Sequence, residues 1–330
     1  MISLGANENP LGMPESARRA IAASLADAGR YPDANGTALK AALSARLAVP
    51  TGWLTLGSGS SELLELAAQA LVLAGQSIVY SQYGFIVYSQ ATAHAHARAI
   101  VVPAKGFGHD LDAMHAAIGT DTRLVFVANP NNPTGTFIDG AALQAFIAAV
   151  PKHATVLLDE AYTEYLPPAQ RYNSMAWVGR FENLIVTRTF SKAYGLAGLR
   201  VGYAVSQPAL AARLNARRPR FNVTAPALAA AQAVLDDTAW LEKTFTVNAE
   251  GRVQLESALA AMGVACVPSS GNFVLAHIGD AKAAHARLLS QGIEVSLLDN
   301  YGLPEWLRIS VGLREQNAQV LDILREVVTA

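Results

Sequence analysis

Short apolar runs alternate with longer segments of helical spacing along the first two thirds of the chain. The apolar runs lack alternating polar residues, which is typical of parallel strands that are buried on both faces. We therefore expect an α/β fold with a mainly parallel, seven-stranded sheet sandwiched by helices. The expected strands are residues 53–56, 77–80, 99–102, 124–128, 155–158, 184–187 and 200–205.

The segment 66–97 needs a separate interpretation because it contains no Asp, Glu, Lys or Arg and is long enough to span a bilayer. Leu63, Ala67 and Leu71 recur at helical spacing before Gly75, a residue that ends helices. Several Gln and Ser residues also interrupt the segment. We therefore expect helix, turn, strand and helix here, and no transmembrane span.

The pattern changes after Pro219 and Pro226, where a long helix is expected from about residue 226 to 262. It is followed by strand-like runs and an amphipathic terminal helix near residues 320–328. The strand-like runs are residues 264–267, 272–276, 293–297 and 307–311. These patterns predict a large domain (30–225), a smaller C-terminal α+β domain (226–330) and an N-terminal segment (1–29) that packs near the small domain.

Composition excludes several classes of protein. The 330 residues have 25 Lys+Arg against 26 Asp+Glu, a balance that fits neither a general nucleic-acid binder nor a polybasic membrane anchor. Hydrophobic residues make up 52% and charged residues 15%, which indicates a large core and a covered subunit interface. The single cysteine, Cys266, and the absence of a signal-peptide pattern predict a cytoplasmic protein.

The first candidate site is GSGSSE at residues 57–62, between a predicted strand and a predicted helix. Free N–H groups and the positive end of the helix dipole would bind a phosphate there. An ordinary glycine-rich turn with a serine N-cap is the alternative. A dinucleotide site, and with it a nucleotide-dependent oxidoreductase, fits less well because Glu62 stands where the third glycine of that fingerprint belongs.

Two further motifs follow predicted strands. NPNNPTG, at residues 129–135, would hold asparagine amides rigidly at the carboxyl end of the sheet, where α/β proteins bind ligands. In LLDEAYTEY, Asp159 could stabilise a protonated ring nitrogen and Tyr162 could donate to an oxyanion. The alternatives are a plain turn for the first motif and a helix N-cap for Asp159.

The fourth motif is TRTFSKAYGLAGLRVGY, in which Lys192 follows Ser191 and precedes Arg200 by eight residues. A lysine among hydroxyls and glycines can form a Schiff base with an aldehyde cofactor, and an arginine can bind a phosphate with two hydrogen bonds. An ordinary solvated lysine is the alternative. Phe190 and Tyr194 make its surroundings too apolar for that interpretation.

The order of GSGSSE, NPNNPTG, DEAY, TFSKAYGLAGLR and LRISVG resembles that of the fold-type I pyridoxal-phosphate aminotransferases, most closely the histidinol-phosphate aminotransferase family. LGANENPLG and RYPDANGTALKAAL are similar to that family as well. The resemblance covers nearly the whole chain. It implies transfer of an amino group from histidinol phosphate to 2-oxoglutarate in two half-reactions, with pyridoxal 5′-phosphate attached to Lys192.

The resemblance also implies roles for particular residues and a homodimer that acts on small molecules, without a metal, nucleic acid or membrane. The catalytic residues would be Lys192, Asp159 and Tyr162. The substrate would contact Arg308, Asn132 and Asn7, with Arg308 on the α-carboxylate of an amino-acid substrate. The cofactor would contact Gly59, Ser60, Ser61, Tyr83, Asn132, Asp159, Tyr162, Thr189, Ser191, Lys192, Arg200 and, from the neighbouring subunit, Tyr31.

Two departures from the family pattern affect the expected substrate. Ser296 stands where the family usually has an arginine that binds the substrate phosphate, and the arm before the ANENP motif is short. An aminotransferase for aromatic or other amino acids, a decarboxylase of the threonine-phosphate type and a non-catalytic cofactor-binding regulator therefore remain alternatives. His94 and His96 could share a strand face as metal ligands, but surface or packing roles are favoured because no further ligand motif accompanies them.

Overall fold

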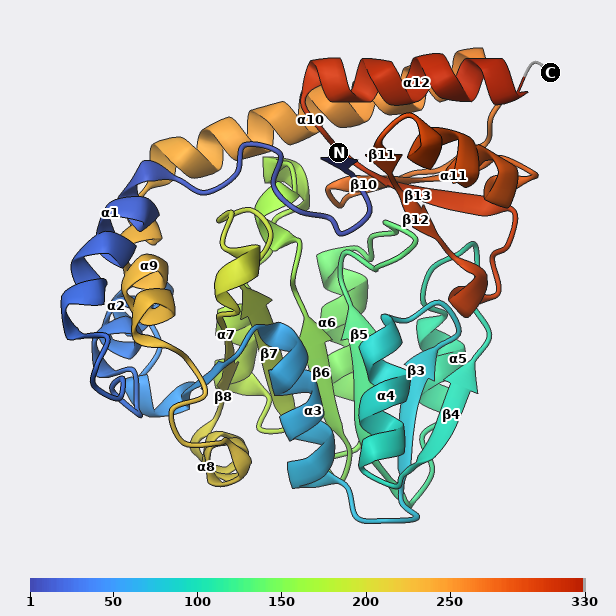
Figure 1. Cartoon of the computed structure of the whole chain (residues 1–330). Helices are drawn as coiled ribbons and strands as arrows, with labels where there is room; N and C mark the ends of the chain where they lie inside the picture. The colour runs from blue at the N-terminus through green and yellow to red at the C-terminus, as the bar shows by residue number, and fades with distance from the viewer. Residues whose placement is uncertain (329–330) are drawn as a thin grey trace.

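The computed structural model describes residues 1–328 and has the predicted seven-stranded sheet at its centre (Figure 1). The strand order is β2-β8-β7-β6-β5-β3-β4, and only β8 runs antiparallel to its neighbours. Each strand overlaps a predicted one. The strands are β2 (Leu54–Gly57), β3 (Ser77–Ser81), β4 (Arg98–Val102), β5 (Thr122–Ala128), β6 (Thr155–Asp159), β7 (Leu184–Thr189) and β8 (Gly202–Ser206).

Helices cover both faces of this sheet (Figure 1). On β6, Leu157 belongs to the core on one face, whereas Val156 and Leu158 belong to the core on the other. Burial on both faces explains why the strands lack polar alternation. One face carries α3 (Ser60–Leu71), α4 (Ile86–His94) and α8 (Pro208–Arg217), and the other carries α5 (Leu111–Ala116), α6 (Gly140–Ala149) and α7 (Ser174–Arg180).

The uncharged segment 66–97 forms the end of α3, then β3 and α4, which agrees with the predicted order of elements. Leu71, near the end of α3, and Ile78, on β3, both belong to the core on that face of the large sheet. No helix within residues 1–328 has the length and the apolar character that crossing a membrane requires.

A smaller antiparallel sheet, β12-β13-β10-β9, follows the large one. Three helices pack on it, and the apolar stripe of the last helix, with Val320 and Leu324 fully buried, lies in its core. These elements are β9 (Cys266–Val267), β10 (Phe273–His277), β12 (Ser296–Leu297), β13 (Trp306–Ser310), α10 (Thr238–Ala261), α11 (Ala281–Ser290) and α12 (Arg314–Val328).

Two predicted elements are each divided in the structure. The expected helix 226–262 is two helices, α9 (Ala225–Val234) and α10, because the Asp237 side chain accepts a hydrogen bond from the backbone of Trp240 and starts a new helix. The expected strand 293–297 is also two strands. Its first part, β11 (Ile293–Glu294), pairs with β1 (Ile2–Ser3), whereas β12 joins the small sheet.

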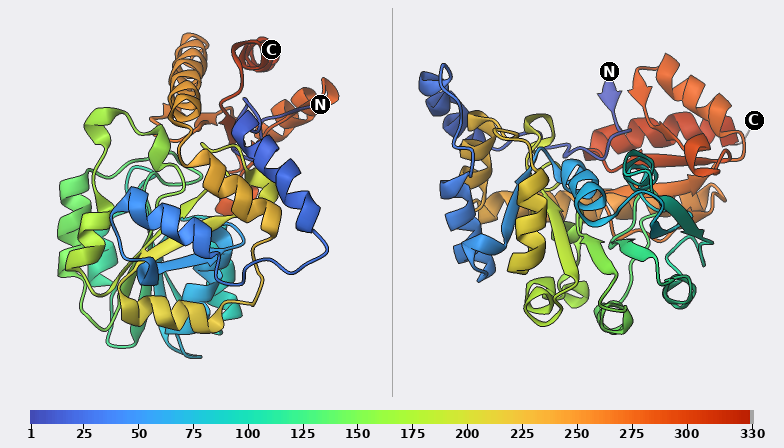
Figure 2. Two further views of the ribbon diagram at one scale, coloured as in Figure 1. Left: turned by 90° about the vertical axis from the view of Figure 1, so that its left-hand side faces the viewer. Right: turned by 90° about the horizontal axis from the view of Figure 1, so that it is seen from below.

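The N-terminal segment lies near the small sheet only at its beginning. β1 pairs with β11, and Leu4 belongs to the core of the small sheet. Farther along, α1 (Glu15–Ser24) packs against α9, and Ala17 joins the core of the large sheet. Figure 2 shows α1, α9 and α2 (Thr37–Leu47) together at one side of the large sheet. Of residues 1–29, the first few therefore lie near the small sheet, whereas α1 lies beside the large one.

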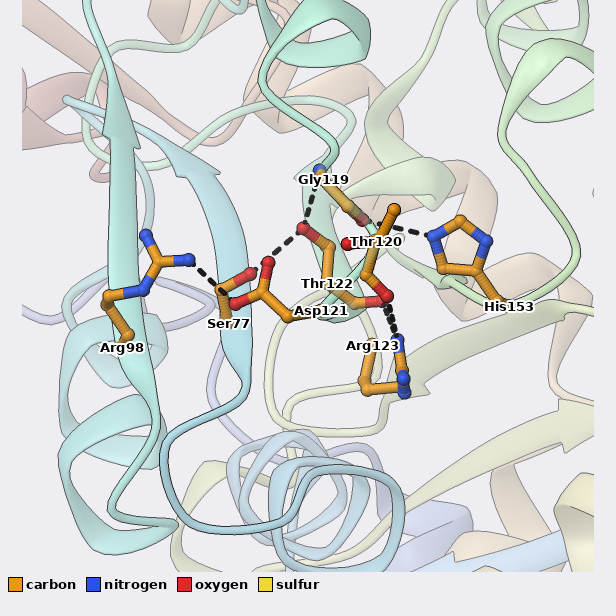
Figure 3. Close-up of polar contacts among 8 residues, drawn as sticks. All are labelled: Ser77, Arg98, Gly119, Thr120, Asp121, Thr122, Arg123 and His153. Atoms are coloured by element: carbon orange, nitrogen blue, oxygen red, sulfur yellow. Dashed lines mark hydrogen bonds and ion pairs between the residues drawn. The ribbon is translucent and has the colours of Figure 1, made fainter.

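A polar cluster joins the starts of β3, β4 and β5 at the amino edge of the large sheet (Figure 3). Arg98 donates a hydrogen bond of 2.6 Å to Asp121, and the hydroxyls of Ser77 and Thr122 are 2.9 Å apart. The Asp121 and Arg98 side chains are both exposed. The cluster therefore lies at the edge opposite to the carboxyl ends of the strands.

Candidate active site

The carboxyl ends of the central strands, the N-terminal segment and β13 enclose a cavity of about 200 Å³. Residues from both ends of the chain therefore meet at one place, the edge of the sheet where α/β proteins bind ligands. The predicted residues that line the cavity are Asn7, Ser60, Ser61, Asn132, Asp159, Tyr162, Thr189, Ser191, Lys192, Arg200 and Arg308.

One corner of the cavity is suited to an anion. α3 begins at Ser60, so the N–H groups of its first turn have no helical partner and its positive end faces the cavity. Arg200 donates a hydrogen bond of 3.0 Å to the Ser191 hydroxyl, which also accepts one of 3.0 Å from Thr189. Gly59 lies directly behind, with φ of +78°, and a Cβ atom there would collide with the Arg200 guanidinium. The glycine therefore allows Arg200 to lie close to the helix start.

Asp159 ends β6 at this cavity and is only 5% exposed. Its carboxylate accepts hydrogen bonds of 3.2 Å from the hydroxyls of Tyr88 and Thr187. Burial raises the pKa of the Asp159 carboxyl to about 6, and the two hydrogen bonds oppose that rise. The next helical turn begins only at Thr163, so Asp159 is not its N-cap and is available to a ligand.

Lys192 follows β7, and its amine donates a hydrogen bond of 2.9 Å to the carbonyl oxygen of Ala6. Burial, together with the nearby Arg308 guanidinium, lowers the pKa of the Lys192 amine to about 8. A larger fraction of this amine is neutral at pH 7 than for an ordinary lysine. It can therefore attack an aldehyde, which a solvated lysine does poorly.

Arg308 enters the cavity from β13 of the small sheet. Its guanidinium donates hydrogen bonds of 2.6 Å to the Asn132 side chain and to the Gly5 carbonyl, and one of 3.0 Å to the Ser296 hydroxyl. Its buried Nε–H has no hydrogen-bond partner within residues 1–328. A spare donor on a buried arginine fits the binding of a carboxylate or phosphate.

Tyr162 and Asn7 meet at the cavity wall. The Asn7 amide donates a hydrogen bond of 3.1 Å to the Tyr162 hydroxyl, and the Asn7 backbone is itself held by Ser310. Burial raises the pKa of the Tyr162 phenol to about 12. The hydroxyl is therefore protonated at neutral pH and can donate a hydrogen bond to an oxyanion.

The structure does not bring Tyr83 or Tyr31 to the cavity of this chain. Tyr83 packs against Phe107, with ring centroids 5.9 Å apart, and Phe85 from the same loop lines the cavity instead. Tyr31 is 83% exposed and stacks on Phe221 at 4.7 Å. Tyr83 is thus held in an aromatic cluster outside the cavity, whereas Tyr31 faces outward.

Sequence reasoning missed several contributors to the site. The sequence could have predicted Thr187 at the site, because it lies two residues before Thr189 on β7 and therefore on the same face of the strand. No sequence pattern could have predicted Tyr88 or the Ala6 carbonyl, since their positions depend on how α4 and the N-terminal segment pack. The unpredicted lining residues are Ala6, Phe85, Ala128, Pro130 and Ala161.

His94 and His96 are exposed and lie outside the cavity. Nδ1 of His94 is 3.1 Å from the Glu65 carboxylate, an interaction at the surface. The part of the chain that the structure describes has no cluster of three or more metal-ligating side chains. These histidines therefore have surface positions.

Fold and site together define the class of protein. The sequence matches the family "Aminotransferase class I and II" over residues 1–324, and the chain therefore belongs to this family. It is a pyridoxal-phosphate-dependent aminotransferase with the fold-type I architecture, in agreement with the prediction.

More specific similarities lie within this class. Histidinol-phosphate aminotransferase 1 of Cupriavidus pinatubonensis is 57% identical, over 99% of this chain and 88% of the relative. Histidinol-phosphate aminotransferase 2 of Ralstonia nicotianae is 56% identical, over 99% and 89%. The crystal structure of histidinol-phosphate aminotransferase from Sinorhizobium meliloti with pyridoxal-5′-phosphate has a TM-score of 0.93 and 31% identity, over 99% of this chain and 90% of that chain.

Proposed function

We propose that this protein is a histidinol-phosphate aminotransferase that passes the amino group of its donor to 2-oxoglutarate. The observation that carries the proposal is the 57% identity, over 99% of this chain, to a relative with that name. The cavity supports it, because it combines a lysine of lowered pKa with an arginine that has a spare donor.

The charges in the cavity fit pyridoxal 5′-phosphate. Its phosphate would bind Ser60, Ser191 and Arg200, and Asp159 would hold the ring nitrogen in its protonated form. Asn132 and Tyr162 would donate hydrogen bonds to its phenolic oxygen. When bound, the cofactor supplies an aldehyde that takes up the amino group and a ring that accepts the electron pair released at the donor's Cα.

Lys192 would move the proton during the reaction. Its neutral amine accepts the Cα proton of the amino donor, and its ammonium form returns a proton to the Cα of the new amino acid in the second half-reaction. The pKa of about 8 suits both tasks because each form of the amine is accessible near neutral pH.

Arg308 would bind the anionic group of each substrate in turn, the phosphate of the donor and a carboxylate of the acceptor. Ser296 adds no positive charge beside it: its hydroxyl donates a hydrogen bond of 2.6 Å to the Gly5 carbonyl and accepts one from Arg308. This neutral neighbour favours a second candidate function, transfer from unphosphorylated aromatic amino acids. Preference for histidinol phosphate should therefore be weaker than the family resemblance implies.

A homodimer is part of the proposal. Tyr31 is 83% exposed and does not line the cavity of its own chain, which suits a residue that contacts the cofactor phosphate of a neighbouring subunit. The proposal also places the enzyme in the cytoplasm, since Cys266 is a free thiol of the kind common in reducing compartments.

A panel of amino donors, each with 2-oxoglutarate as acceptor, tests the proposed function. Histidinol phosphate, phenylalanine, tyrosine and histidine should be compared by the rate of glutamate formation, with Lys192→Ala as the inactive control. Histidinol phosphate should give the highest kcat/KM. Release of carbon dioxide without glutamate would instead identify a decarboxylase, and bound cofactor without any turnover would identify a regulator.

A further inference from the structure

A second cavity, of about 430 Å³, lies behind the active site. The two cavities share no lining residue, but neighbouring residues serve both: Tyr162 and Thr189 line the active site, whereas Thr163 and Arg188 line the second cavity. The two cavities are therefore back to back across one layer of chain. The second cavity is lined by Arg46, Leu47, Thr163, Glu164, Arg171, Tyr172, Arg188, Tyr194, Tyr203, Thr238, Leu241, Glu242 and Phe245.

The charged groups of this cavity are balanced. Arg188 forms a buried ion pair of 2.8 Å with Glu160, so this arginine is already neutralised. The remaining charges are those of two arginines and two glutamates, none of which forms an ion pair within residues 1–328. Two charges of each sign match a zwitterion better than a simple anion or cation. These four residues are Arg46, Arg171, Glu164 and Glu242.

Two polar groups of this cavity have capacity for a further partner. Tyr194 is 5% exposed, and its hydroxyl makes no hydrogen bond with any described residue. Burial raises the pKa of the Glu164 carboxyl to about 7, and the Arg188 and Arg46 guanidiniums oppose that rise. A ligand with an ammonium group would stabilise the ionised form of Glu164, and its polar atoms could satisfy Tyr194.

The rest of the wall is apolar or aromatic. Phe245 and Leu241 come from α10, and Leu47 follows from the end of α2. The Arg171 guanidinium lies 5.6 Å from the centre of the Phe245 ring, which places a cation beside this apolar surface. A small molecule with an apolar body and charged groups at one end fits such a wall.

We propose that this cavity binds an α-amino acid with an aromatic or large apolar side chain. The ligand's ammonium group binds Glu164, its carboxylate binds Arg46 and Arg171, and its side chain packs against Phe245.

Hydrogen bonds connect the wall of the second cavity to the segment that carries Lys192. The carbonyl of Ala193 accepts hydrogen bonds of 3.0 Å from the Trp240 indole and 2.9 Å from the Asn9 amide, so the start of α10 is tied to the lysine segment. Leu241 and Tyr194, the next residues along each segment, both line the second cavity. A ligand there contacts both sides of this connection, so the site can modulate the active site.

Calorimetry with L-phenylalanine tests the proposal. Holoenzyme whose cofactor has been reduced onto Lys192 with borohydride cannot turn over, and saturating 2-oxoglutarate fills the Arg308 side of the active site. L-phenylalanine should still bind with one equivalent per chain. Glu164→Gln and Arg46→Ala should each weaken its binding about tenfold or more, the loss expected for a charged hydrogen bond. Lys243→Ala, an exposed neighbour on α10 that does not line the cavity, should leave binding unchanged.

Two analogues of phenylalanine test whether the site requires both charged groups of a zwitterion. 3-Phenylpropionate lacks the amine and phenylalanine methyl ester lacks the carboxylate, so each should bind at least about tenfold more weakly than phenylalanine. Equal binding of 3-phenylpropionate, binding that ignores both variants, or no binding at all would overturn the proposal. Because no turnover is measured, none of these results bears on the proposed aminotransferase activity. Retained cofactor absorbance in each variant shows that it has folded.

Discussion

The Tyr88 hydroxyl donates a hydrogen bond of 3.2 Å to Oδ2 of Asp159, from a helix that begins just after β3. Tyr88 is fully buried and stacks on Phe126 with ring centroids 4.5 Å apart. Core packing of the large sheet therefore fixes the position of the phenol. Through this hydrogen bond, the hydrophobic core also orients the carboxylate of the active site.

Tyr88→Phe should raise the pKa of Asp159 above its value of about 6. The lost hydrogen bond favours the ionised carboxylate, so its removal favours the protonated one. The acid limb of the kcat profile should move about one to two units to higher pH, as expected for one charged hydrogen bond. Turnover at pH 7 should therefore fall about two- to tenfold, because a smaller fraction of the carboxyl is ionised there. Tyr80→Phe, another buried tyrosine of the same core, is the control. Identical acid limbs in the two variants would contradict this role for Tyr88.

Asp159→Ala should keep its cofactor but lose turnover by about a hundredfold or more. The anion corner holds the cofactor independently, whereas stabilisation of the protonated ring nitrogen depends on this carboxylate. Cofactor absorbance after dialysis and kcat measure the two effects separately. Asp121→Ala, at the opposite edge of the sheet (Figure 3), should change neither. Near-normal turnover in Asp159→Ala would refute the electrostatic role.

The rate at which the apoenzyme takes up pyridoxal 5′-phosphate should rise with pH through a midpoint of about 8. The neutral form of Lys192 is the nucleophile, and burial together with Arg308 favours that form. Arg308→Met removes a neighbouring positive charge, so the midpoint should move upward. Stopped-flow absorbance across pH measures it. A midpoint near 10.5, the value of an ordinary lysine, would mean that the environment of Lys192 does not activate it.

Ser296→Arg should increase the preference for histidinol phosphate over phenylalanine. A second cation beside Arg308 would form a charged hydrogen bond with the phosphate, worth about ten- to a hundredfold in affinity. The ratio of the two kcat/KM values, compared between the natural enzyme and the variant, measures this. Ser290→Arg, at an exposed position on α11, controls for added charge. If the natural enzyme already prefers histidinol phosphate strongly and the ratio does not move, Ser296 does not set specificity.

Mixed subunits test whether Tyr31 serves the neighbouring active site. Tyr31→Phe and Lys192→Ala each damage both sites of their own homodimers. A hybrid of the two has one site with an intact Lys192 and an intact Tyr31, so mixing after mild dissociation should restore activity above the sum of the separate variants. Activity that stays at that sum, or a fully active monomer in sedimentation, would count against a shared site.

The sequence was informative where one short segment determines the structure. Apolar runs located all seven central strands. Six of them are buried at nearly every position, whereas the edge strand β4 is apolar in sequence although most of it is exposed. Asp159 and Lys192 could be predicted because Asp159 ends β6 and Lys192 lies in the segment just after β7, at the carboxyl edge of the sheet. The choice of Phe85 over Tyr83 could not be predicted, since it depends on how α4 packs against the sheet. The break between β11, which ends at Glu294, and β12, which begins at Ser296, could not be predicted either. It arises because the distant strand β1 pairs with β11.

On β7, Arg188 faces the second cavity and Thr189 faces the active site. Successive side chains of a strand point to opposite sides, so the loss or gain of one residue within this strand would exchange the two. A guanidinium would then enter the cofactor cavity, and Glu160 would lose the partner of its buried charge. We therefore expect evolution and protein engineering alike to alter this strand by substitution, while its length tolerates no change.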